Sequence, residues 1–185
     1  AEIVQERQHA DRVVVVTGPV GAGKSTIAAA LSDLLGHAEI PHGMIDVDYV
    51  RWCYPAPADD RFHAKLGRRN TAAVAANYRA AGARVIVLAD VVEDMGQRGA
   101  YEAAIPDAEV SIVRLRVPLD VIARRLRARM AQDSAESLEW HLRRAPELEA
   151  IMDERGIGDL VVDAGERGPA AIAGEIAQKL GLIPS

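Results

Sequence analysis

The chain has 185 residues, of which 49% are apolar and only 4% aromatic, so its core has to be built from Ala, Val, Leu and Ile. No run of 18 apolar residues is present that would cross a membrane, and a net charge of −5 argues against broad binding to nucleic acid or anionic membranes. The single cysteine, Cys53, has no intrachain disulfide partner. We therefore expect one α/β domain over residues 1–185, cytoplasmic, a monomer or homodimer, with no nucleic-acid or membrane partner.

The first elements expected along the chain are a strand over residues 12–17 and a helix over residues 24–36. Residues 1–11 are polar and predict a frayed segment or a short helix. The strand is a run of valines of the buried type, and the helix carries apolar residues at helical spacing before Gly36. The segment that joins them, Gly18-Pro19-Val20-Gly21-Ala22-Gly23-Lys24-Ser25-Thr26, fits G-x-x-x-x-G-K-[ST].

A glycine loop between a buried strand and a helix is the setting of a phosphate-binding loop. We expect Gly18, Gly21 and Gly23 to reach φ values that are closed to other residues, so that the backbone turns tightly. The turn would aim backbone N–H groups, including that of Ala22, at an anion near the positive end of the helix. A chance glycine-rich turn is the alternative, and the matching flanks on both sides disfavour it.

Three side chains of the loop have expected roles toward ATP and Mg²⁺. Lys24 would reach the β- and γ-phosphates, and the Ser25 hydroxyl would join the Mg²⁺ shell. Thr26 would support the first helical turn beside the nucleotide. The motif therefore predicts nucleotide binding, while it leaves open which reaction follows.

The next strand, expected over residues 43–48, ends in two carboxylates. Asp46 and Asp48 stand at i and i+2, which would place both on one face of the strand. Asp46 would serve the metal shell through water, and Asp48 would orient or deprotonate an acceptor hydroxyl. Arg51 would hold an anionic or hydroxylated acceptor. The alternative is a strand-end turn in which an Asp caps the next helix.

The middle of the chain predicts a loop over residues 52–60, a helix over residues 60–81, a strand over residues 84–89 and a helix over residues 94–104. Asp90 directly follows the strand, where it would serve the metal shell or a purely structural role. The sequence leaves these two possibilities open.

The following strand, residues 109–117, leads into an arginine-rich helix that opens at Pro118. Arg125 and Arg129 share one face at i and i+4, so we expect them to stack on adenine and bind phosphates. Arg124 and Arg127 are interpreted as a solvated basic face.

A further helical segment runs to about residue 154 and is expected to be interrupted near Pro146. Arg143 and Arg144 on this segment would close over the phosphates, a role that the sequence leaves open. Trp140 and His141 are interpreted as packing residues.

The last elements are a strand over residues 159–162, a loop over residues 163–169 and a helix with Ile172, Ile176 and Leu180 at i, i+4 and i+8. Strands and helices thus alternate throughout, which predicts a parallel sheet with right-handed crossovers. Ligands of such sheets bind at the carboxyl ends of the strands.

The first half of the chain resembles the adenylylsulfate kinases, which belong to the small-molecule kinases of the phosphate-loop class. The resemblance rests on the loop at residues 18–26, on D-V-D-Y-V-R at residues 46–51 against D-G-D-N-V-R, and on the Ala-rich helix over residues 60–82. It implies that Asp48 faces the acceptor, that Asp46 is a metal-shell partner, and that Arg51 and Asn70 are acceptor ligands.

The second half resembles instead the lid entry of shikimate, gluconate and adenylate kinases. The resemblance rests on V-P-L-D at residues 117–120 and on R-L-R-A-R at residues 125–129. It implies that Arg125 covers adenine and that the loop around Gly165 forms the other adenine wall. The whole chain resembles bacterial phosphate-loop kinases with this mixed pattern.

Together these features predict a P-loop NTPase fold with a five-stranded parallel sheet in the order 2-3-1-4-5 and a mobile helical lid near residues 127–145. The predicted function is an ATP- and Mg²⁺-dependent kinase that transfers the γ-phosphoryl group to a hydroxyl of a small molecule. Lys24, Asp46, Asp48 and Arg129 would form its catalytic set. The alternatives are a nucleotide-binding regulatory ATPase or switch without a small acceptor, and an antibiotic phosphotransferase.

Overall fold

The computed structural model describes residues 10–184, so most of the frayed segment or short helix expected over residues 1–11 lies outside the described residues. The strands are β1 (Asp11–Thr17), β2 (His42–Asp46), β3 (Val85–Ala89), β4 (Ala108–Arg116) and β5 (Leu160–Asp163). The helices are α1 (Lys24–His37), α2 (Val47–Val50), α3 (Ala64–Ala80), α4 (Gln97–Ala104), α5 (Leu119–Arg129), α6 (Ala135–Glu154) and α7 (Pro169–Lys179).

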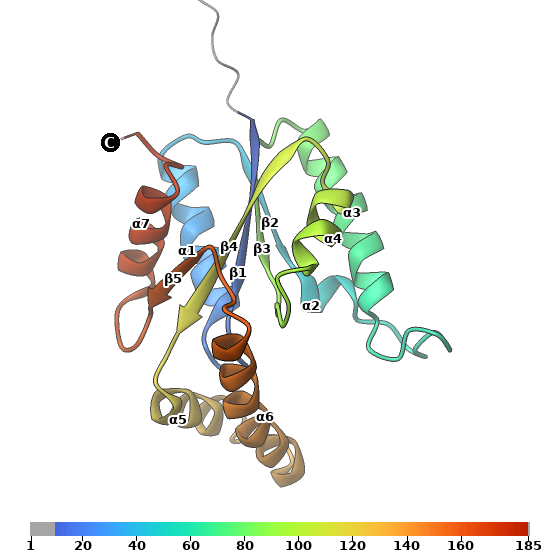
Figure 1. The fold of residues 1–185 in the computed structure, drawn as a ribbon, viewed down its shortest axis with the longest axis vertical. Helices are drawn as coiled ribbons and strands as arrows, with labels where there is room; N and C mark the ends of the chain where they lie inside the picture. Colours follow the sequence, from blue (N-terminus) through green and yellow to red (C-terminus); the bar gives the residue numbers. More distant parts are fainter. Residues whose placement is uncertain (1–9, 185) are drawn as a thin grey trace, which may run out of the picture.

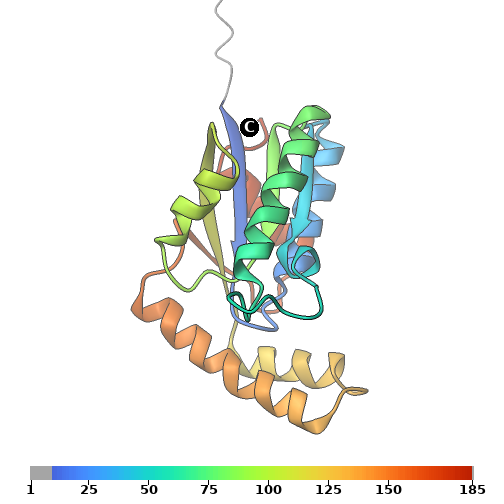
Figure 2. The ribbon, with the colours of Figure 1, turned by 90° about the vertical axis from the view of Figure 1, so that its right-hand side faces the viewer.

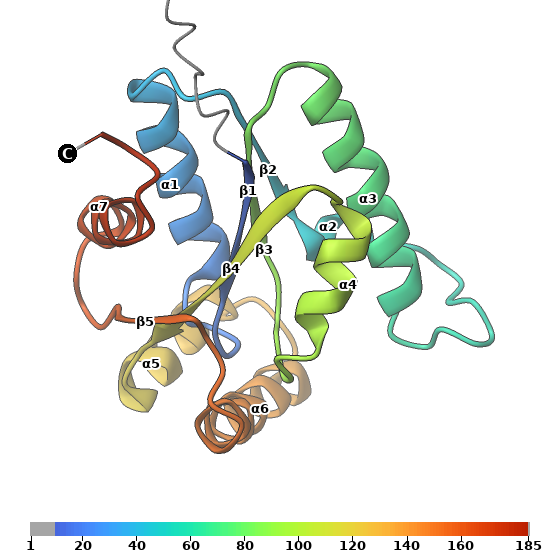
Figure 3. The ribbon, with the colours of Figure 1, turned by 45° about the horizontal axis from the view of Figure 1, so that its top comes forward.

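The five strands form one parallel sheet in the order β2-β3-β1-β4-β5, which confirms the predicted topology. The central strand β1 pairs with β3 along one edge and with β4 along the other. Its four valines, residues 13–16, are fully buried, because helices cover both faces of the sheet. Helices α1 and α7 lie on one face, and α3 and α4 lie on the other (Figures 1 and 3).

The core is divided by the sheet into two apolar layers. On the α1 and α7 side, Leu31 and Ile176 are completely buried against the sheet. On the α3 and α4 side, Ala75, Tyr101 and Ile105 pack against the alternate residues of the same strands. The two layers hold the strands rigidly, so that loops at their carboxyl ends keep fixed positions.

Helices α5 and α6 lie beyond the carboxyl ends of the strands rather than on a face of the sheet (Figures 1 and 2). The segment over residues 127–145, predicted to be a lid, comprises the end of α5, a turn, and the first half of α6. Parallel strands open their ligand sites at this edge. The two helices therefore border the region where a ligand is expected.

The interruption expected near Pro146 is wrong, because α6 is continuous from residue 135 to residue 154 with Pro146 inside it. Proline removes one helical hydrogen bond, so other contacts must hold the helix. Leu148 is buried, and the buried guanidinium of Arg114 on β4 pairs with Glu149 and Asp153, each at 2.9 Å. Tertiary packing thus overrides the local cost of the proline.

The helix expected over residues 60–81 begins later, at Ala64. The side chain of Asp60 accepts hydrogen bonds from the backbone N–H groups of Lys65 (3.1 Å) and Leu66 (2.9 Å). Residues 60–63 consequently form a turn that caps the helix instead of its first turn.

Candidate active site

The loop over residues 18–23 joins β1 to α1 as predicted, but its glycines serve two different purposes. Gly21 and Gly23 have φ of 84° and 91°, in the left-handed region that favours glycine. The expectation of a positive φ is wrong for Gly18. There a Cβ atom would lie 2.9 Å from Cβ of Ala22 and 3.2 Å from the carbonyl oxygen of Leu115, so Gly18 is needed for close packing.

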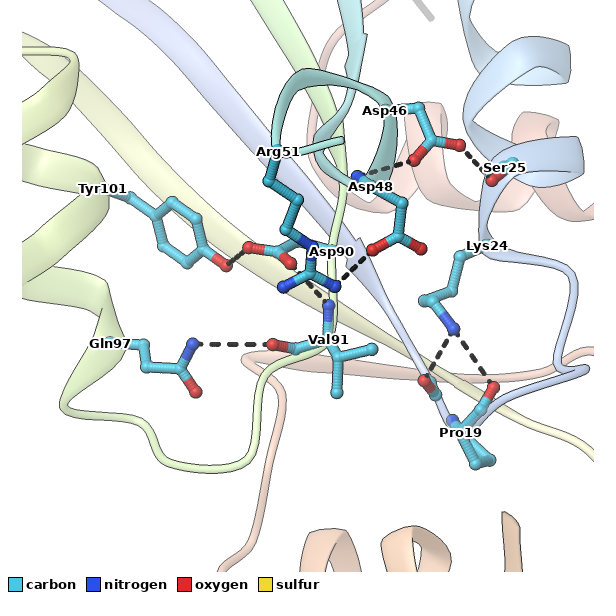
Figure 4. Close-up of polar contacts among 11 residues, drawn as sticks. Pro19, Lys24, Ser25, Asp46, Asp48, Arg51, Asp90, Val91, Gln97 and Tyr101 are labelled. Carbon is cyan, nitrogen blue, oxygen red and sulfur yellow. Dashed lines mark hydrogen bonds and ion pairs between the residues drawn. The ribbon is translucent and has the colours of Figure 1, made fainter. Parts of the chain in front are cut away.

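Lys24 is the first residue of α1, and its ammonium group folds back over the loop (Figure 4). Nζ donates to the carbonyl oxygens of Gly18 at 3.1 Å and Pro19 at 3.2 Å. Burial lowers the pKa of Lys24, while the carboxylates of Asp48 and Asp90 act in the opposite direction. An incoming phosphate chain would meet a cation that is already positioned and only partly solvated.

Asp46 and Asp48 come together, but by a route other than the one predicted. Strand β2 ends at Asp46, and Asp48 lies in the short helix α2, so the two do not share a strand face. Asp46 is instead the N-cap of α2, and its Oδ1 accepts from the backbone N–H of Asp48 at 3.1 Å. The other oxygen, Oδ2, accepts from the hydroxyl of Ser25 (Figure 4). The capping role and the proximity to the phosphate loop therefore coexist.

The oxygen atoms of Ser25 and Asp46 suit a magnesium ion. Mg²⁺ prefers hard oxygen donors and is bound by one or two protein groups together with phosphates and water. A hydroxyl in direct contact with a carboxylate, next to the loop that would hold phosphates, is such a donor set. Within residues 10–184 no group of three or more His, Cys, Asp or Glu side chains could hold a metal ion.

Arg51 and Asn70 take different positions around α2. The guanidinium of Arg51 donates to the carboxylate of Asp48 and lines the cleft described below. Asn70 on α3 does not line this cleft, and its side-chain amide donates to the carbonyl oxygen of Val50 at 2.5 Å. The structure thus gives Asn70 a part in fixing the end of α2, and a direct contact with an acceptor stays a prediction.

Asp90, which follows β3, is held by two donors. Oδ2 accepts from the hydroxyl of Tyr101 on α4 at 2.7 Å, and Oδ1 accepts from the backbone N–H of Val91 at 2.9 Å (Figure 4). Burial raises the pKa of Asp90, and the hydrogen bond from Tyr101 opposes that effect. Burial and the neighbouring Asp90 both raise the pKa of Tyr101. Sequence reasoning missed Tyr101, which lies eleven positions further along the chain on a different element.

Several of the side chains described above border a cleft of about 1190 Å³ at the carboxyl ends of the strands. Its wall includes Lys24, Asp48, Asp90 and Arg129. Drug-sized ligands occupy pockets of roughly 300–1,000 Å³, so the cleft has room for a nucleotide's phosphates and a second molecule. Predicted functional side chains from separate segments of the chain thus reach one space.

A second cavity of about 590 Å³ adjoins the phosphate loop on the side of α5 and the loop before α7. Arg125 and Arg129 both line it, as expected from their shared helix face. The guanidinium of Arg125 donates to the carbonyl oxygen of Gly165 at 2.7 Å. Arg124, interpreted as solvated, forms an exposed ion pair with Glu166. This placement suits the adenine base of a nucleotide whose phosphates lie on the phosphate loop.

The first half of α6 contributes to the main cleft through Arg144 and Trp140. Arg144 donates to Glu93 at 2.6 Å, whereas Arg143 is exposed and does not line the cleft. The interpretation of Trp140 as a packing residue is wrong, because it is half exposed on the cleft wall, edge-on to His141 with ring centroids 4.9 Å apart. Leu138 and Leu142 of the same helix pack against the core, so Trp140, two positions from each, lies on the opposite helix face.

A family model described as AAA domain matches residues 14–144, well over half of the chain. The chain belongs to this AAA domain family. A search of curated proteins with this AAA-domain sequence found no match. Within residues 10–184, no helix combines the length and apolar character needed to cross a bilayer.

Solved structures share the fold of this AAA-domain protein over nearly its whole length. The tunicamycin resistance protein of Deinococcus radiodurans superposes with a TM-score of 0.64 and 19% identity, covering 95% of this chain and 99% of that chain. The APS kinase of Mycobacterium tuberculosis, solved with AMPPNP and APS, gives 0.61 and 18%, with 93% and 98% covered. A gluconokinase of Sinorhizobium meliloti gives 0.58 and 22%, with 93% and 97% covered. The fold is thus that of the P-loop kinases.

Proposed function

We propose that the protein is an ATP- and Mg²⁺-dependent kinase that transfers the γ-phosphoryl group to a hydroxyl of a small molecule. The observation that carries the proposal is the position of Asp48. Its carboxylate approaches the ammonium group of Lys24 across the cleft, from a different strand end. A carboxylate opposite the phosphate-binding lysine would serve as the general base that takes the proton from the acceptor hydroxyl.

The phosphate end supplies binding and charge stabilisation. The backbone N–H groups of the loop and the start of α1 favour an anion, and Lys24 would exchange its two carbonyl partners for phosphate oxygens. Ser25 and Asp46 would hold Mg²⁺, which when bound neutralises charge on the β- and γ-phosphates. Arg129, which lines both cavities, would contact the phosphates from α5.

In the transfer step, one bond to the γ-phosphorus forms as another breaks. The acceptor oxygen forms a bond to the γ-phosphorus while the bond from that phosphorus to the β,γ-bridging oxygen breaks, which leaves ADP. The acceptor proton passes to the carboxylate of Asp48. Arg51 pairs with that carboxylate and keeps it oriented toward the cleft. Phosphoryl transfer depends mainly on such positioning and on electrostatic stabilisation.

The fold supports this assignment. The printed titles of the similar structures name APS kinase, gluconokinase and a tunicamycin resistance protein. Those proteins are similar in fold only, at 18–22% identity. The lid over residues 127–145 is proposed to close over the phosphates and exclude water.

The test is ADP release from MgATP against a panel of acceptors, with Lys24→Ala as the blank. The panel holds adenylylsulfate, nucleosides, nucleoside monophosphates, sugar acids, shikimate, and aminoglycoside, phenicol and nucleoside antibiotics. One acceptor that raises ADP release far above basal hydrolysis, with the product carrying the phosphoryl group on oxygen, supports the proposal. A low, Lys24-dependent rate that no acceptor changes favours a nucleotide-dependent switch instead.

A further inference from the structure

The cleft wall formed by the start of α3 and the loop before it has no part in the transfer step described above. This wall consists of Arg61, Phe62, His63, Gly67, Arg68 and Thr71, and we refer to it as the α3 wall. His63, Gly67 and Thr71 follow one another at intervals of four residues, so they share one face of the helix. Side chains on this face lie beside Arg51, whose Cβ would be 3.3 Å from a Cβ atom at Gly67.

Two buried polar atoms of the α3 wall have no partner among the described residues. Thr71 is 3% exposed, and its hydroxyl makes no hydrogen bond. Nε2 of His63 is also buried and makes none. An unsatisfied buried polar group costs about 1–3 kcal/mol, and native proteins keep few of them. Two such atoms on the wall of one cleft indicate that a ligand supplies the missing partners.

The backbone at His63 is held in an unusual conformation beside these atoms. Its φ is 55°, in the left-handed region that non-glycine residues rarely adopt. The carbonyl oxygen of Asp60 accepts from the N–H of His63 at 2.8 Å, while the Asp60 side chain caps the same helix. Strained residues of this kind persist at ligand sites when their surroundings fix them. The imidazole is therefore placed at the cleft by its surroundings.

Aromatic side chains gather next to the same wall. The chain has seven Phe, Tyr and Trp residues, and four of them, Tyr49, Trp52, Tyr54 and Phe62, lie within residues 49–62. All four are 70% exposed or more, and Phe62 lines the cleft. In a protein so poor in aromatic residues, this concentration on α2 and the exposed loop that follows it marks a binding surface (the loop projects beyond α3 in Figure 3).

Positive charge is available on the α3 wall as well. Within residues 10–184, neither Arg61 nor Arg68 forms an ion pair, and both line the cleft. The guanidinium carbon of Arg61 lies 5.5 Å from the ring centroid of Phe62. Arg51, by contrast, is neutralised by Asp48. A ligand on this wall would meet two uncompensated cations next to an aromatic ring.

From these observations we infer that the α3 wall is the acceptor subsite, and that the acceptor carries a flat ring with a hydrogen-bonding edge together with an anionic group. The ring stacks on Phe62, polar groups at two different points of the ligand pair with Thr71 and His63, which lie about two helical turns apart, and the anionic group binds Arg68. The identification of this ligand as the phosphoryl acceptor rests on the proposed function. The binding surface itself does not depend on catalysis.

The test measures binding of three probes by calorimetry to protein saturated with MgAMPPNP, so that the nucleotide site is filled. Adenosine 5′-monophosphate has both ring and anion, ribose 5-phosphate lacks the ring, and adenosine lacks the anion. We expect the first to bind at least about tenfold more tightly than either of the others, the loss expected from one stacking or charged contact. Equal binding of ribose 5-phosphate, or no binding of the first probe, overturns the inference.

Matched variants locate the surface. Phe62→Leu and Arg68→Gln should each weaken binding of adenosine 5′-monophosphate about tenfold. Lys65→Gln and Arg69→Gln, which alter exposed residues of the same helix that do not line the cleft, should bind it like wild type. If the controls lose binding as much as the test variants, the α3 wall is not the subsite.

Thr71→Val separates binding from a structural role. It keeps the shape of the side chain and removes a hydroxyl that has no partner, so the Tm should be unchanged or higher while probe binding weakens roughly three- to tenfold. A lower Tm with unchanged binding contradicts the inference.

Failure of the inference and failure of the proposed function give different results. Probe binding at the α3 wall with no phosphoryl transfer to any acceptor supports the ligand subsite and contradicts the proposed kinase activity. Transfer to a ringless acceptor such as gluconate, with no effect of Phe62→Leu on its KM, supports the proposed kinase activity and contradicts the ligand subsite.

Discussion

The proposed phosphate end and the proposed acceptor end of the cleft are built in opposite ways. The phosphate end is one continuous segment, residues 18–26, between a buried strand and the helix it begins. Its polar groups have partners: Lys24 has two carbonyls and Ser25 has Asp46. The acceptor end draws on separate elements and leaves Thr71 and His63 with unpartnered atoms. A local motif fixes the first, whereas the second is assembled by tertiary structure and keeps polar atoms that a ligand would pair.

The largest expected effect breaks the phosphate end. Lys24→Ala removes the cation that the loop positions, so we expect kcat to fall about 10³-fold and ATP binding to weaken. Steady-state ADP release and a calorimetric ATP titration measure both. Lys179→Ala, which breaks only an exposed pair with Glu175, is the matched control and should behave like wild type. A wild-type rate in Lys24→Ala would disprove the role of the loop.

The second effect belongs to the boundary between the two ends. Asp48→Asn keeps the size of the side chain and removes the proton acceptor, so kcat should fall about 10²-fold with little change in ATP affinity. Asp59→Asn, at an exposed carboxylate outside the cleft, is the control. If Asp48→Asn instead raises the Kd for ATP and spares kcat, Asp48 belongs to the nucleotide site and not to the acceptor.

A third, smaller effect tests how far the nucleotide site extends beyond the loop. Arg125→Ala removes a guanidinium that lines the second cavity and bonds to Gly165, and the KM for ATP should rise about tenfold. Arg124→Ala, one residue away, breaks only the exposed pair with Glu166 and should change KM less than about twofold. Equal effects of the two substitutions would remove the distinction between the two helix faces.

The smallest expected effect concerns stability and pH at Asp90. Burial raises the pKa of Asp90, so the native protein keeps this proton to a higher pH than the unfolded chain. Its ionisation consequently lowers the free energy of unfolding as pH rises through the native pKa. Asp90→Asn removes that loss, so its stability relative to wild type should be greater at about pH 7 than at about pH 4. Urea unfolding of the ligand-free proteins at both pH values measures it, and a difference that does not vary with pH contradicts the expected sign.

The phosphate end could be predicted from sequence because its information is local. The spacing from Gly18 to Ser25, the valine run before it and the helical pattern after it all lie within about 25 residues. The strand order was also predictable, since alternating strands and helices leave few parallel arrangements. The packing constraint that requires glycine at position 18 was not predictable, because it depends on the carbonyl oxygen of Leu115, almost a hundred residues away.

The acceptor end was only partly predictable for the same reason. Asp46, Asp48 and Arg51 were found from their spacing, although the strand turned out to end at Asp46. The hydrogen bond from Tyr101 to Asp90 joins α4 to the end of β3, and no local sequence pattern predicts it. The cluster of aromatic residues over 49–62 was visible in the sequence, but its meaning required their exposure and the neighbouring cleft.

The exposed Cys53 has a practical consequence. It is the chain's single cysteine, and it stands in the loop that carries the aromatic cluster. Trp140, which lines the cleft from α6, is one of only two tryptophans, and the other is Trp52. With Trp52 replaced by Phe, a dye on Cys53 and the indole of Trp140 become a single donor–acceptor pair. Energy transfer between them would report the approach of α6 to the loop that carries Cys53 in solution, at sites that the natural sequence already provides.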